Sequence, residues 1–541
     1  MTAPGGRVVR VGRALEGAAE SRQAAPAVFA AALAVYAAVS IALPLEAGRD
    51  LARYLLVYAQ LFDTHVVYPN ALLARTPGTP LIAGALLDAG PVVSEIGAAA
   101  LYALSIVAWF CVARRFGPVA ALTTAAALLV YPGYVLLFHQ LASDAVFAAA
   151  FALVALLLAR AVDRPTALRA GALGLGVAAL VFARPVGQSL LVLGLAPLLA
   201  ARGPRPRLVA VASFAVGAVV PLVALAVHNS VRADDFTVVR GGSSSLLFRA
   251  FVADRIVEPV NGPASEELAQ AVARELLPNE PYLSRGIDLQ TFFSSGSSRM
   301  HDDLTVLSDR TWGWDDDYRH LGRVAREAIR AHPGTYARGV GRDLWRLVLW
   351  PLYAPVEETP ASAPAPRPSG RALQSTSPPP ADDEPIPSSR EAPYISTPDG
   401  RIREVWTSPT EHSIVFRNPA DAVRAGALDR RVNELLDGLP DRATRPWLVE
   451  RLNDLSRLYP RPFMWLLVGL VAALWRRPRG IVVPAALAAS GLLVLLSTSL
   501  AVYAVAEYAV PVVPAFVLLA TAGLFGRSRD RVSAIDSGRG I

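Results

Sequence analysis

The chain has 541 residues, of which 53% are hydrophobic and only 18% are charged, and its mean hydropathy is +0.38. In soluble proteins about a quarter of the residues are charged, so this composition excludes an ordinary soluble globular protein. The formal charge is +7 and every basic residue other than histidine is arginine; the arginines cluster at the ends of apolar runs, which favours orientation in a membrane over nucleic-acid binding.

Apolar runs of about the 20 residues needed to cross a bilayer recur along the chain. They lie near 26–45, 91–113, 118–137, 143–160, 208–227, 480–503 and 508–525. Two more regions are ambiguous, because 170–201 is interrupted at Arg184-Pro185 and 462–475 is short. The first run has no small-residue cleavage motif, so we expect a retained first span and not a signal peptide.

Arginine clusters assign the two sides of the membrane, because cytoplasmic loops collect arginine. Six clusters flank the apolar runs, at 7–22, 114–115, 160–169, 202–207, 476–479 and 527–531. All six fall on one side if 170–201 crosses twice, as a hairpin that turns at Arg184. The sequence therefore predicts an α-helical polytopic protein of the plasma membrane, with about ten crossings and both termini in the cytoplasm.

The same assignment divides the chain into units. These are 1–227 with a first outer loop at 46–90, an outer region at 228–354, a linker at 355–400, a small helical outer unit at 401–461, C-terminal spans at 462–526 and a cytoplasmic tail at 527–541. Val340–Tyr353 carries three charges, so we expect an interfacial amphipathic helix there and not a crossing. The linker is rich in Pro, Ser and Ala, cannot build a core, and is expected to be disordered.

Polar residues beside the predicted spans gather on the outer side. They are Arg49, Asp50 and Arg53 after the first span, His139 and Asp144 between the third and fourth, Arg184 at the hairpin turn, and Glu507 at the start of the last. A transporter would instead show ionisable residues near mid-span, around broken helices. The pattern favours an enzyme that acts at the outer membrane surface on lipid-linked material.

Asp50 is the main candidate for catalysis. Arg49 and Arg53 lie within one helical turn of it. A carboxylate among guanidinium groups stays ionised, as a general base at neutral pH must. The alternative interpretation is an ion pair at the membrane edge.

The first outer loop places Asp50 after the span, Tyr54 one turn later, and the sequence RTPGTP, at 75–80, before an apolar helix. This order resembles the first outer loop of the GT-C membrane glycosyltransferases, which include protein mannosyltransferases and lipid A aminoarabinose transferases. In that family an Asp, usually Asp-Glu, is followed by a Tyr and a Pro-Gly-Tyr-Pro-like turn. Leu51 stands where the second acidic residue is usual, which weakens metal binding by an acidic pair.

Five later segments resemble the same family in the same order. They are Ser143-Asp144, GVAALVFARPVG at 176–187, the segment 228–242 with His228-Asn229 and Gly241-Gly242, REAIRAHPGTY at 326–336, and Glu507–Pro511. In the last of these, Glu507 stands where an Arg is usual before Tyr508. The linker at 355–400 has no counterpart in the family.

The resemblance implies a GT-C-like bundle that transfers one sugar from a polyprenyl-phosphate donor to a glycan, lipid or protein acceptor of the cell envelope, with inversion. It implies Asp50 as the catalytic base. Arg184, helped by Arg53 or Arg75, would contact the donor phosphate. The remaining substrate-binding candidates are Tyr54, His139, Asp144, Glu507 and Tyr508. The lipid bilayer is a further partner; no organic cofactor is implied, and a divalent cation is left open.

Simpler structural interpretations stand beside these. Arg184 would be an interfacial anchor, and His139 a solvated or capping residue. Asp144 would cap its own helix, and Glu507 would favour a helix N-terminus. Trp312–Tyr318 combines sugar-binding aromatic rings with three carboxylates suited to a cation, but a solvated turn is preferred. The alternative functions are a lipid or polysaccharide transporter and an envelope-assembly scaffold with 228–461 as its docking surface.

Overall fold

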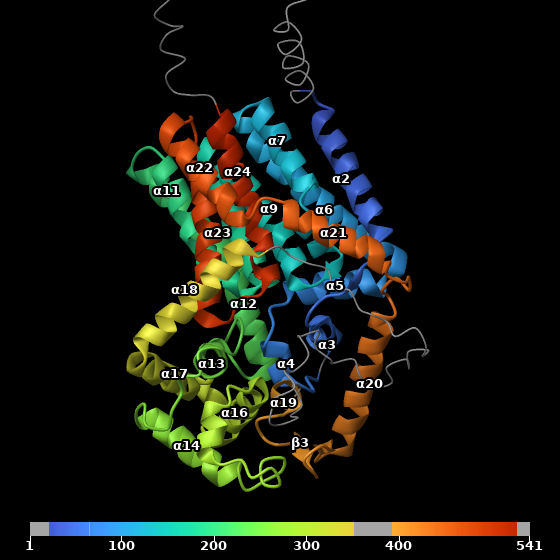
Figure 1. Ribbon diagram of the computed structural model, residues 1–541, viewed down its shortest axis with the longest axis vertical. Helices are drawn as coiled ribbons and strands as arrows, with labels where there is room; N and C mark the ends of the chain where they lie inside the picture. Colours follow the sequence, from blue (N-terminus) through green and yellow to red (C-terminus); the bar gives the residue numbers. More distant parts are fainter. Residues whose placement is uncertain (1–20, 64, 351–391, 527–541) are drawn as a thin grey trace, which may run out of the picture.

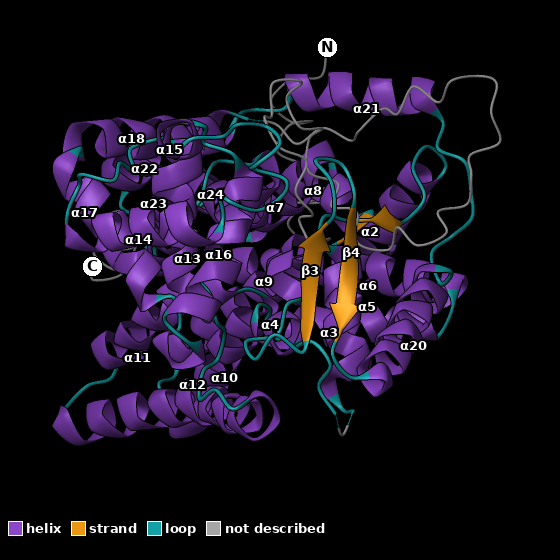
Figure 2. Ribbon diagram, turned by 90° about the horizontal axis from the view of Figure 1, so that it is seen from below, coloured by secondary structure: helices purple, strands orange, loops and turns teal. Residues whose placement is uncertain are grey.

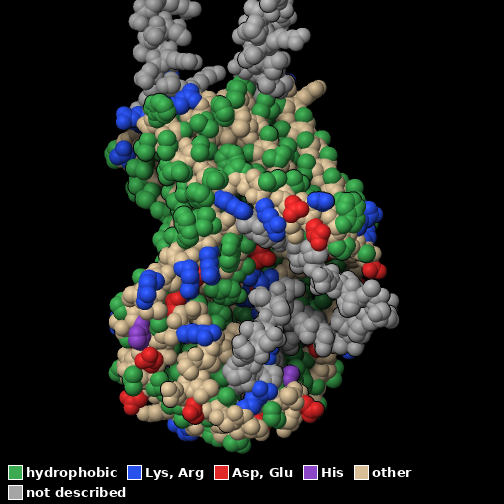
Figure 3. Space-filling model, in the orientation of Figure 1, with side chains coloured by type: hydrophobic (Ala, Val, Ile, Leu, Met, Phe, Trp, Pro, Cys, Tyr) green, Lys and Arg blue, Asp and Glu red, His purple; other side chains and the backbone are tan. Residues whose placement is uncertain are grey.

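The computed structural model describes residues 21–63, 65–350 and 392–526. Apolar helices form a bundle, and a second body lies at one end of it (Figure 1). The start of the first described helix and the end of the last helix both lie at the opposite end of the bundle. Figure 3 shows apolar side chains gathered over the bundle and charged ones over the second body and at the bundle ends. The predicted class, a helical membrane protein, is confirmed.

The bundle is formed by two sets of helices. The first set is α2 (Ala24–Ser40), α6 (Pro91–Ala113), α7 (Pro118–Leu129), α8 (Pro132–Phe138), α9 (Ser143–Asp163), α10 (Ala167–Ala183), α11 (Leu195–Ala200) and α12 (Pro204–Ala233). The second set is α22 (Pro462–Arg476), α23 (Val482–Ala501) and α24 (Val513–Phe525). Short 3-10 segments join some of them, at η1 (Arg114–Phe116), η2 (Pro185–Gly194), η5 (Ala506–Tyr508) and η6 (Val510–Val512).

Within the described residues, six helical stretches are long and apolar enough to cross a membrane, judged by length and composition. They are Pro91–Phe116, Ser143–Asp163, Pro204–Ala233, Pro446–Arg476, Val482–Ala501 and Ala506–Phe525. The pair α7 and α8 makes a seventh, bent by 64°. Ala24–Ser40, Ala167–Ala183 and Pro185–Ala200 are apolar but shorter, so the count of ten crossings stays a prediction.

Three bundle helices begin at Gly-Pro pairs. Gly90, Gly117 and Gly203 have φ angles of 97°, 118° and 95°, which glycine adopts without the steric cost of a Cβ. Each following proline occupies the first helical turn of α6, α7 or α12, where its missing N–H would have no helical partner. These pairs set where the helices start.

The predicted break at Arg184 is present. Helix α10 ends at Ala183, Arg184 is extended, and η2 begins at Pro185. Helix α10 packs closely on α12. The backbones are so close that a Cβ added at Gly174 would collide with the backbone of Phe214. Such small-residue contacts bring helix backbones together in membranes. The end of α10 that carries Arg184 is therefore held firmly in the bundle.

The first outer loop is mostly helical. It contains α3 (Leu51–Leu61), α4 (Pro69–Leu73) and α5 (Gly78–Asp88). Before α3, β1 (Glu46–Ala47) pairs in parallel with β2 (Gln140–Leu141). This short ladder joins the exit from α2 to the start of α9, and so brings the surroundings of Asp50 close to those of Asp144.

The predicted outer region contains a helical body, 242–349, with its own core, which is called the outer body below. Its elements are α13 (Gly242–Phe248), η3 (Arg249–Ala253), α14 (Pro263–Glu275), α15 (Leu289–Ser294), α16 (Ser298–Thr311), η4 (Trp314–Asp316), α17 (Arg319–Ala331) and α18 (Pro333–Leu349). Phe251, Phe292 and Leu304 are among the side chains of this core, which is separate from the bundle core.

A buried network around Arg249 joins this body to the bundle. The fully buried guanidinium donates from Nε to Asp254 Oδ2 at 2.8 Å and from Nη2 to Oδ1 at 3.0 Å. Its Nη1 binds Asp343 of α18 and donates to the carbonyl of Val502, just after α23, at 2.9 Å. One arginine therefore connects three segments that are distant in sequence.

The interfacial helix expected at Val340–Tyr353 corresponds to the second half of α18, and residues 351–353 lie outside the described residues. Three charged side chains were expected at the surface of this helix, but Asp343 is buried against Arg249. Arg342 and Arg346 are about half exposed, as an interfacial helix requires. Because Arg249 offsets the charge of Asp343, this residue is compatible with an apolar environment.

The C-terminal outer unit begins with a β-hairpin, which corrects the expectation of a wholly helical unit at 401–461 (Figure 2). Strand β3 (Ile402–Trp406) pairs antiparallel with β4 (His412–Phe416). Their β-branched and aromatic residues suit a strand, as in Ile402-Arg-Glu-Val-Trp406. Helices α20 (Pro419–Leu436) and α21 (Pro446–Leu458) follow.

The predicted linker 355–400 lies mostly outside the described residues, but its last part is folded. Helix α19 (Ala392–Ile395) contacts α4 and α16. Ile395 and Thr397 are only 2% and 4% exposed. The expectation of disorder is therefore wrong for 392–400, because this stretch buries its side chains against elements distant in sequence and not in a core of its own.

The predicted topology can be tested by thiol labelling. Ser284 is exposed on the outer body, so Ser284→Cys in a Cys111→Ala background should react with an impermeant thiol reagent in intact cells whose outer layers are permeabilised. Arg479→Cys, in an arginine cluster assigned to the cytoplasm, should react only after the inner membrane is broken. The reverse labelling pattern would contradict the topology.

Candidate active site at the junction of bundle and outer body

Asp50 stands directly before α3 in a left-handed backbone conformation, with φ of 63°. Asp and Asn tolerate this region better than most residues, because their short polar side chains form local hydrogen bonds. The conformation turns the chain from β1 into α3. It places Asp50 at the start of that helix, and α3 lies where the bundle meets the outer body (Figure 1).

Two arginines hold the Asp50 carboxylate. Arg53, one turn along α3, places Nη1 at 3.1 Å from Oδ1, and Arg75, between α4 and α5, places Nη2 at 3.3 Å from Oδ2. A carboxylate has about four acceptor positions, so the two guanidinium groups occupy about half of them. The Asp50 side chain is 21% exposed, which leaves it within reach of a ligand.

The charge state of Asp50 is set by opposing effects. Burial alone would raise its pKa, but the positive charges of Arg75, Arg53 and Arg49 outweigh burial and hold the pKa below its ordinary value. Asp50 is therefore ionised at neutral pH. This agrees with the sequence-based expectation for a general base.

A second group of paired charges surrounds Tyr508. Arg184, after α10, pairs with Asp144, in the first turn of α9. Arg49 pairs with Glu507, with 3.1 Å between Nη2 and Oε2. The guanidinium carbons of Arg184 and Arg49 lie 4.4 and 4.8 Å from the centroid of the Tyr508 ring. An aromatic face attracts cations at these distances, so Tyr508 holds both arginines.

These contacts decide between the interpretations of two carboxylates. Asp144 does not cap its own helix, because the start of α9 has no side-chain cap and the Asp144 carboxylate binds Arg184. Glu507 faces Arg49, so it serves as the partner of a cation in addition to its place in the first turn of η5.

Tyr54 connects the two groups. Its side chain is 8% exposed, and the Arg75 guanidinium carbon lies 5.8 Å from its ring centroid. Burial raises the pKa of its hydroxyl, and the charges of Arg75, Asp50 and Arg184, which belong to both groups, also act on that pKa. The sequence-based choice of Tyr54 as a site residue therefore agrees with its position.

The sequence analysis missed Tyr394, which lies in α19. The Arg53 guanidinium carbon is 4.2 Å from the Tyr394 ring centroid, and Arg53 Nη1 donates to the Tyr394 hydroxyl at 3.4 Å. The Arg75 guanidinium carbon is 5.7 Å from the same centroid. The available signal was a Pro-Tyr-Ile sequence at the end of a segment that is otherwise rich in Pro, Ser and small polar residues.

The assembled site contains more positive than negative charge. Its arginines are Arg49, Arg53, Arg75 and Arg184, and its carboxylates are Asp50, Asp144 and Glu507. Four cations against three anions leave one positive charge in excess. Such a site can bind a phosphate anion through guanidinium groups and offer a carboxylate to a hydroxyl proton.

His139 does not join this site. It is fully buried, and its ring stacks on Tyr36 with 4.0 Å between centroids. Among the described residues neither ring nitrogen has a hydrogen-bond partner. The expected substrate contact is therefore not supported, and the alternative of a solvated residue is wrong, because the imidazole packs among aromatic rings as an apolar ring does.

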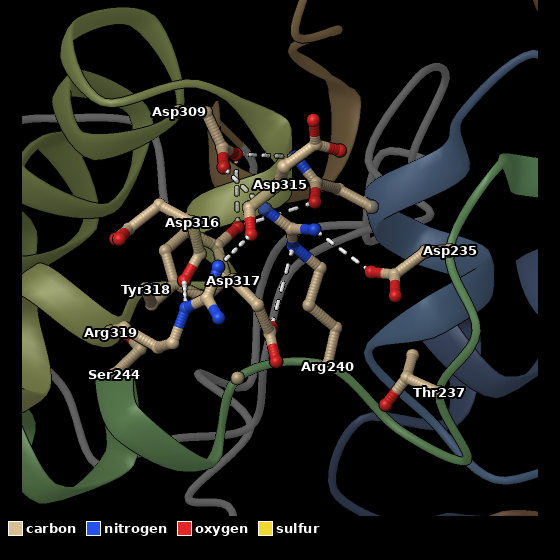
Figure 4. Close-up of polar contacts among 12 residues, drawn as sticks. Asp235, Thr237, Arg240, Ser244, Asp309, Asp315, Asp316, Asp317, Tyr318 and Arg319 are labelled. Atoms are coloured by element: carbon tan, nitrogen blue, oxygen red, sulfur yellow. Dashed lines mark hydrogen bonds and ion pairs between the residues drawn. The ribbon is translucent and has the colours of Figure 1, made fainter.

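The acidic segment Trp312–Tyr318 lies at a different cluster, centred on Arg240 (Figure 4). Arg240 pairs with Asp235 at 2.9 Å and with Asp309 at 2.8 Å. Its guanidinium carbon lies 3.6 Å from the Trp314 ring centroid. Two of the three aromatic residues of the segment, Trp314 and Tyr318, therefore contact an arginine of the protein itself.

The three consecutive aspartates of this segment serve different partners. Asp316 accepts a hydrogen bond from the backbone N–H of His320 at 2.8 Å, and Asp317 lies 4.0 Å from Arg240 Nε. The backbone carbonyl of Asp315 accepts from Arg319. Across the described ranges, no group of three or more His, Cys, Asp or Glu side chains is placed to hold a metal ion.

Comparisons of the chain with known protein families, characterised proteins and solved structures found no match. Function is therefore inferred from the chemistry of the site, and the resemblance noted in the sequence remains a resemblance.

Proposed function

We propose that this protein is a membrane glycosyltransferase that moves a sugar from a polyprenyl-phosphate donor to an acceptor of the cell envelope at the outer face of the plasma membrane. The observation that carries the proposal is an ionised, partly exposed Asp50 held by Arg53 and Arg75 beside a second pair of arginines. The ordered segments that resemble GT-C glycosyltransferases support the same reaction class.

In the proposed reaction Asp50 takes the proton of an acceptor hydroxyl while the hydroxyl oxygen forms a bond to the anomeric carbon. The bond between that carbon and the donor phosphate oxygen breaks, and its electron pair leaves with the lipid phosphate. Arg184, with Arg53 or Arg75, offsets the developing negative charge. This single displacement inverts the anomeric configuration.

The placement of the site supports a lipid-linked donor. Asp50 directly precedes α3, which lies where the bundle meets the outer body, and Tyr508 lies at the start of the apolar stretch Ala506–Phe525 (Figure 1). A phosphate at the arginines would therefore have apolar helices beside it for its polyprenyl chain. Nucleotide sugars are made in the cytoplasm, whereas a lipid-linked sugar is presented at the outer face. The excess positive charge suits the anionic donor phosphate.

The transporter alternative has less support. Within the described parts of 91–227 and 462–526, the buried residues among His, Asp, Glu and Arg are His139 and Asp144, and Asp144 belongs to the candidate site. A transporter would be expected to carry such groups around a site at mid-membrane. This distribution favours chemistry at one membrane surface.

The proposal is tested with purified protein in lipid nanodiscs, a panel of polyprenyl-phosphate sugars with labelled sugar, and a cell-envelope extract as acceptor. One donor should lose its label to the acceptor, with release of polyprenyl phosphate, whereas nucleotide sugars should give no transfer. Absence of transfer from every donor, together with movement of labelled lipid across proteoliposome membranes, would favour the transporter.

Arg184→Ala is expected to lower kcat/KM about 10- to 100-fold, with a higher KM for the donor as well as a lower kcat, because a charge-assisted contact to phosphate is lost. The matched control is Arg115→Ala, which removes another arginine–aspartate pair, with Asp163, at the opposite end of α9. Steady-state kinetics at varied donor concentration give kcat and the donor KM of each variant separately. An unchanged donor KM in Arg184→Ala would contradict a phosphate contact.

A further inference from the structure

We propose that Tyr394 is a positioning residue for Asp50, and that the C-terminal outer unit, with the segment 392–400 that leads into it, completes the site by placing the Tyr394 ring on Arg53 and Arg75. The inference rests on the proposed function and extends it to a residue that neither the sequence pattern nor the family resemblance indicated.

One side chain contacts both arginines that hold the carboxylate. The Tyr394 ring centroid lies 4.2 Å from the Arg53 guanidinium carbon and 5.7 Å from that of Arg75. Arg53 Nη1 donates both to Asp50 Oδ1, at 3.1 Å, and to the Tyr394 hydroxyl, at 3.4 Å. Tyr394 therefore touches the partners of Asp50, and acts on Asp50 through them.

The physical role of the ring follows from the two cations beside it. Two guanidinium groups on one carboxylate repel each other, and the negative face of an aromatic ring offsets part of that repulsion. Arginine side chains also have high rotamer freedom, which a contacting ring restricts. Tyr394 thus keeps Arg53 and Arg75 directed at the two oxygens of Asp50.

The segment that carries Tyr394 is firmly attached to the first outer loop. Asn70 of α4 donates from Nδ2 to the carbonyl of Ser396 at 3.4 Å, and Ile395 is buried. The backbone N–H of Thr397 donates to the carbonyl of Ile402 at 2.9 Å, which joins the segment to β3. Tyr394 is therefore held between the first outer loop and the C-terminal unit.

A second contact docks the same unit on the same loop. Helix α20 packs against α3 and α5, and Arg431 of α20 pairs with Asp88, at the end of α5, at 2.7 Å. The unit thus contacts the loop at both α4 and α5, on either side of Arg75 in the sequence. Its position determines the position of the Tyr394 ring.

Two substitutions distinguish an effect of the aromatic ring from an effect of simple space filling. Tyr394→Phe keeps the aromatic face, and Tyr394→Leu keeps an apolar side chain without that face. Tyr394→Leu should lower kcat/KM about tenfold, whereas Tyr394→Phe should stay within about threefold of the unchanged protein. In Tyr394→Leu the acid limb of the pH–rate profile should move to higher pH, because loosened arginines let the pKa of Asp50 rise toward its ordinary value of about 3.9.

The matched control is Trp350→Leu, which removes a ring 5.7 Å from the Arg346 guanidinium carbon, away from the site. It should leave kcat/KM and the pH profile unchanged. A Tyr394→Leu protein with a normal profile and rate overturns the inference alone, as does one that only melts at lower temperature. If the wild-type protein neither binds nor uses any polyprenyl-phosphate sugar, the proposed function is overturned, and this inference with it.

Discussion

Replacing Asp50 with Asn is expected to lower the rate of sugar transfer about 10²- to 10⁴-fold, because the substitution removes the proton acceptor and keeps the shape of the side chain. Asn also tolerates the left-handed backbone at position 50, where φ is 63°, so the change adds little strain. Donor binding should persist, since Arg184 and its partner Asp144 are untouched. Single-turnover transfer at saturating donor measures the effect.

The pH dependence of the unchanged protein gives a second measure of Asp50. The surrounding arginines hold its pKa below the ordinary value despite burial. Asp50 therefore stays ionised as the pH falls from neutral, and the rate should not decline through its protonation until below about pH 4. A decline that begins near pH 6 would point to a different titrating group.

The control for Asp50→Asn is Asp63→Asn. Asp63 is another carboxylate of the first outer loop, and its exposed side chain accepts a hydrogen bond from the backbone N–H of His65 at 3.4 Å. Asn keeps an oxygen acceptor for this bond, so the control should turn over normally. A rate near that of the unchanged protein in Asp50→Asn would remove Asp50 from catalysis and leave Asp144 as the next carboxylate to test.

Replacing Arg249 with Met is expected to destabilise the protein by about 3–5 kcal/mol, because it leaves the carboxylates of Asp254 and Asp343 buried without their cation. Titration of detergent-solubilised protein with SDS measures the loss. The control is Arg346→Met, since Arg346 is 49% exposed and lies 4.0 Å from Asp343. Its effect should stay below about 1 kcal/mol.

The loss of stability in the Arg249→Met protein should depend on pH. Burial already raises the pKa of Asp254, although Arg249 opposes it. Without Arg249 the folded-state pKa rises further above the unfolded value, so stability is retained at acidic pH and is lost as the pH rises through the folded-state pKa. The variant should therefore unfold less readily near pH 5 than near pH 8, and a deficit independent of pH would contradict this explanation.

Much of the bundle could be predicted from the sequence, because its signals are local. Apolar runs located most helices, and Arg184-Pro185 marked a real break between α10 and η2. The β3–β4 hairpin was not predicted, because strands of five residues each give only a short pattern that does not distinguish a strand from part of a helix. The crossing number could not be settled in the same way, since α2 and α10 are apolar but short.

The candidate site was predictable where charge alone marked it. Asp50 and Arg53 are neighbours on one helical turn, and their pairing follows from sequence spacing. The pair of Arg49 and Glu507 joins the two ends of the chain, which no local pattern reveals. Tyr394 was hidden by the composition of the residues before it, because a low-complexity stretch gives no sign of where folded structure resumes.

The position of Tyr508 has a consequence for how the protein is made. Residues 506–508 open the last apolar stretch of the chain, so Arg49 and Arg184 meet the ring between them only after this stretch enters the membrane. A nascent chain that stops short of it already contains Asp50, Arg53 and Arg75. It also contains Asp144, the partner of Arg184, but it lacks Glu507, the partner of Arg49, and the Tyr508 ring that both arginines contact. Activity toward a lipid-linked sugar should therefore appear only after residues 506–508 have been synthesised and the apolar stretch that they open has been inserted.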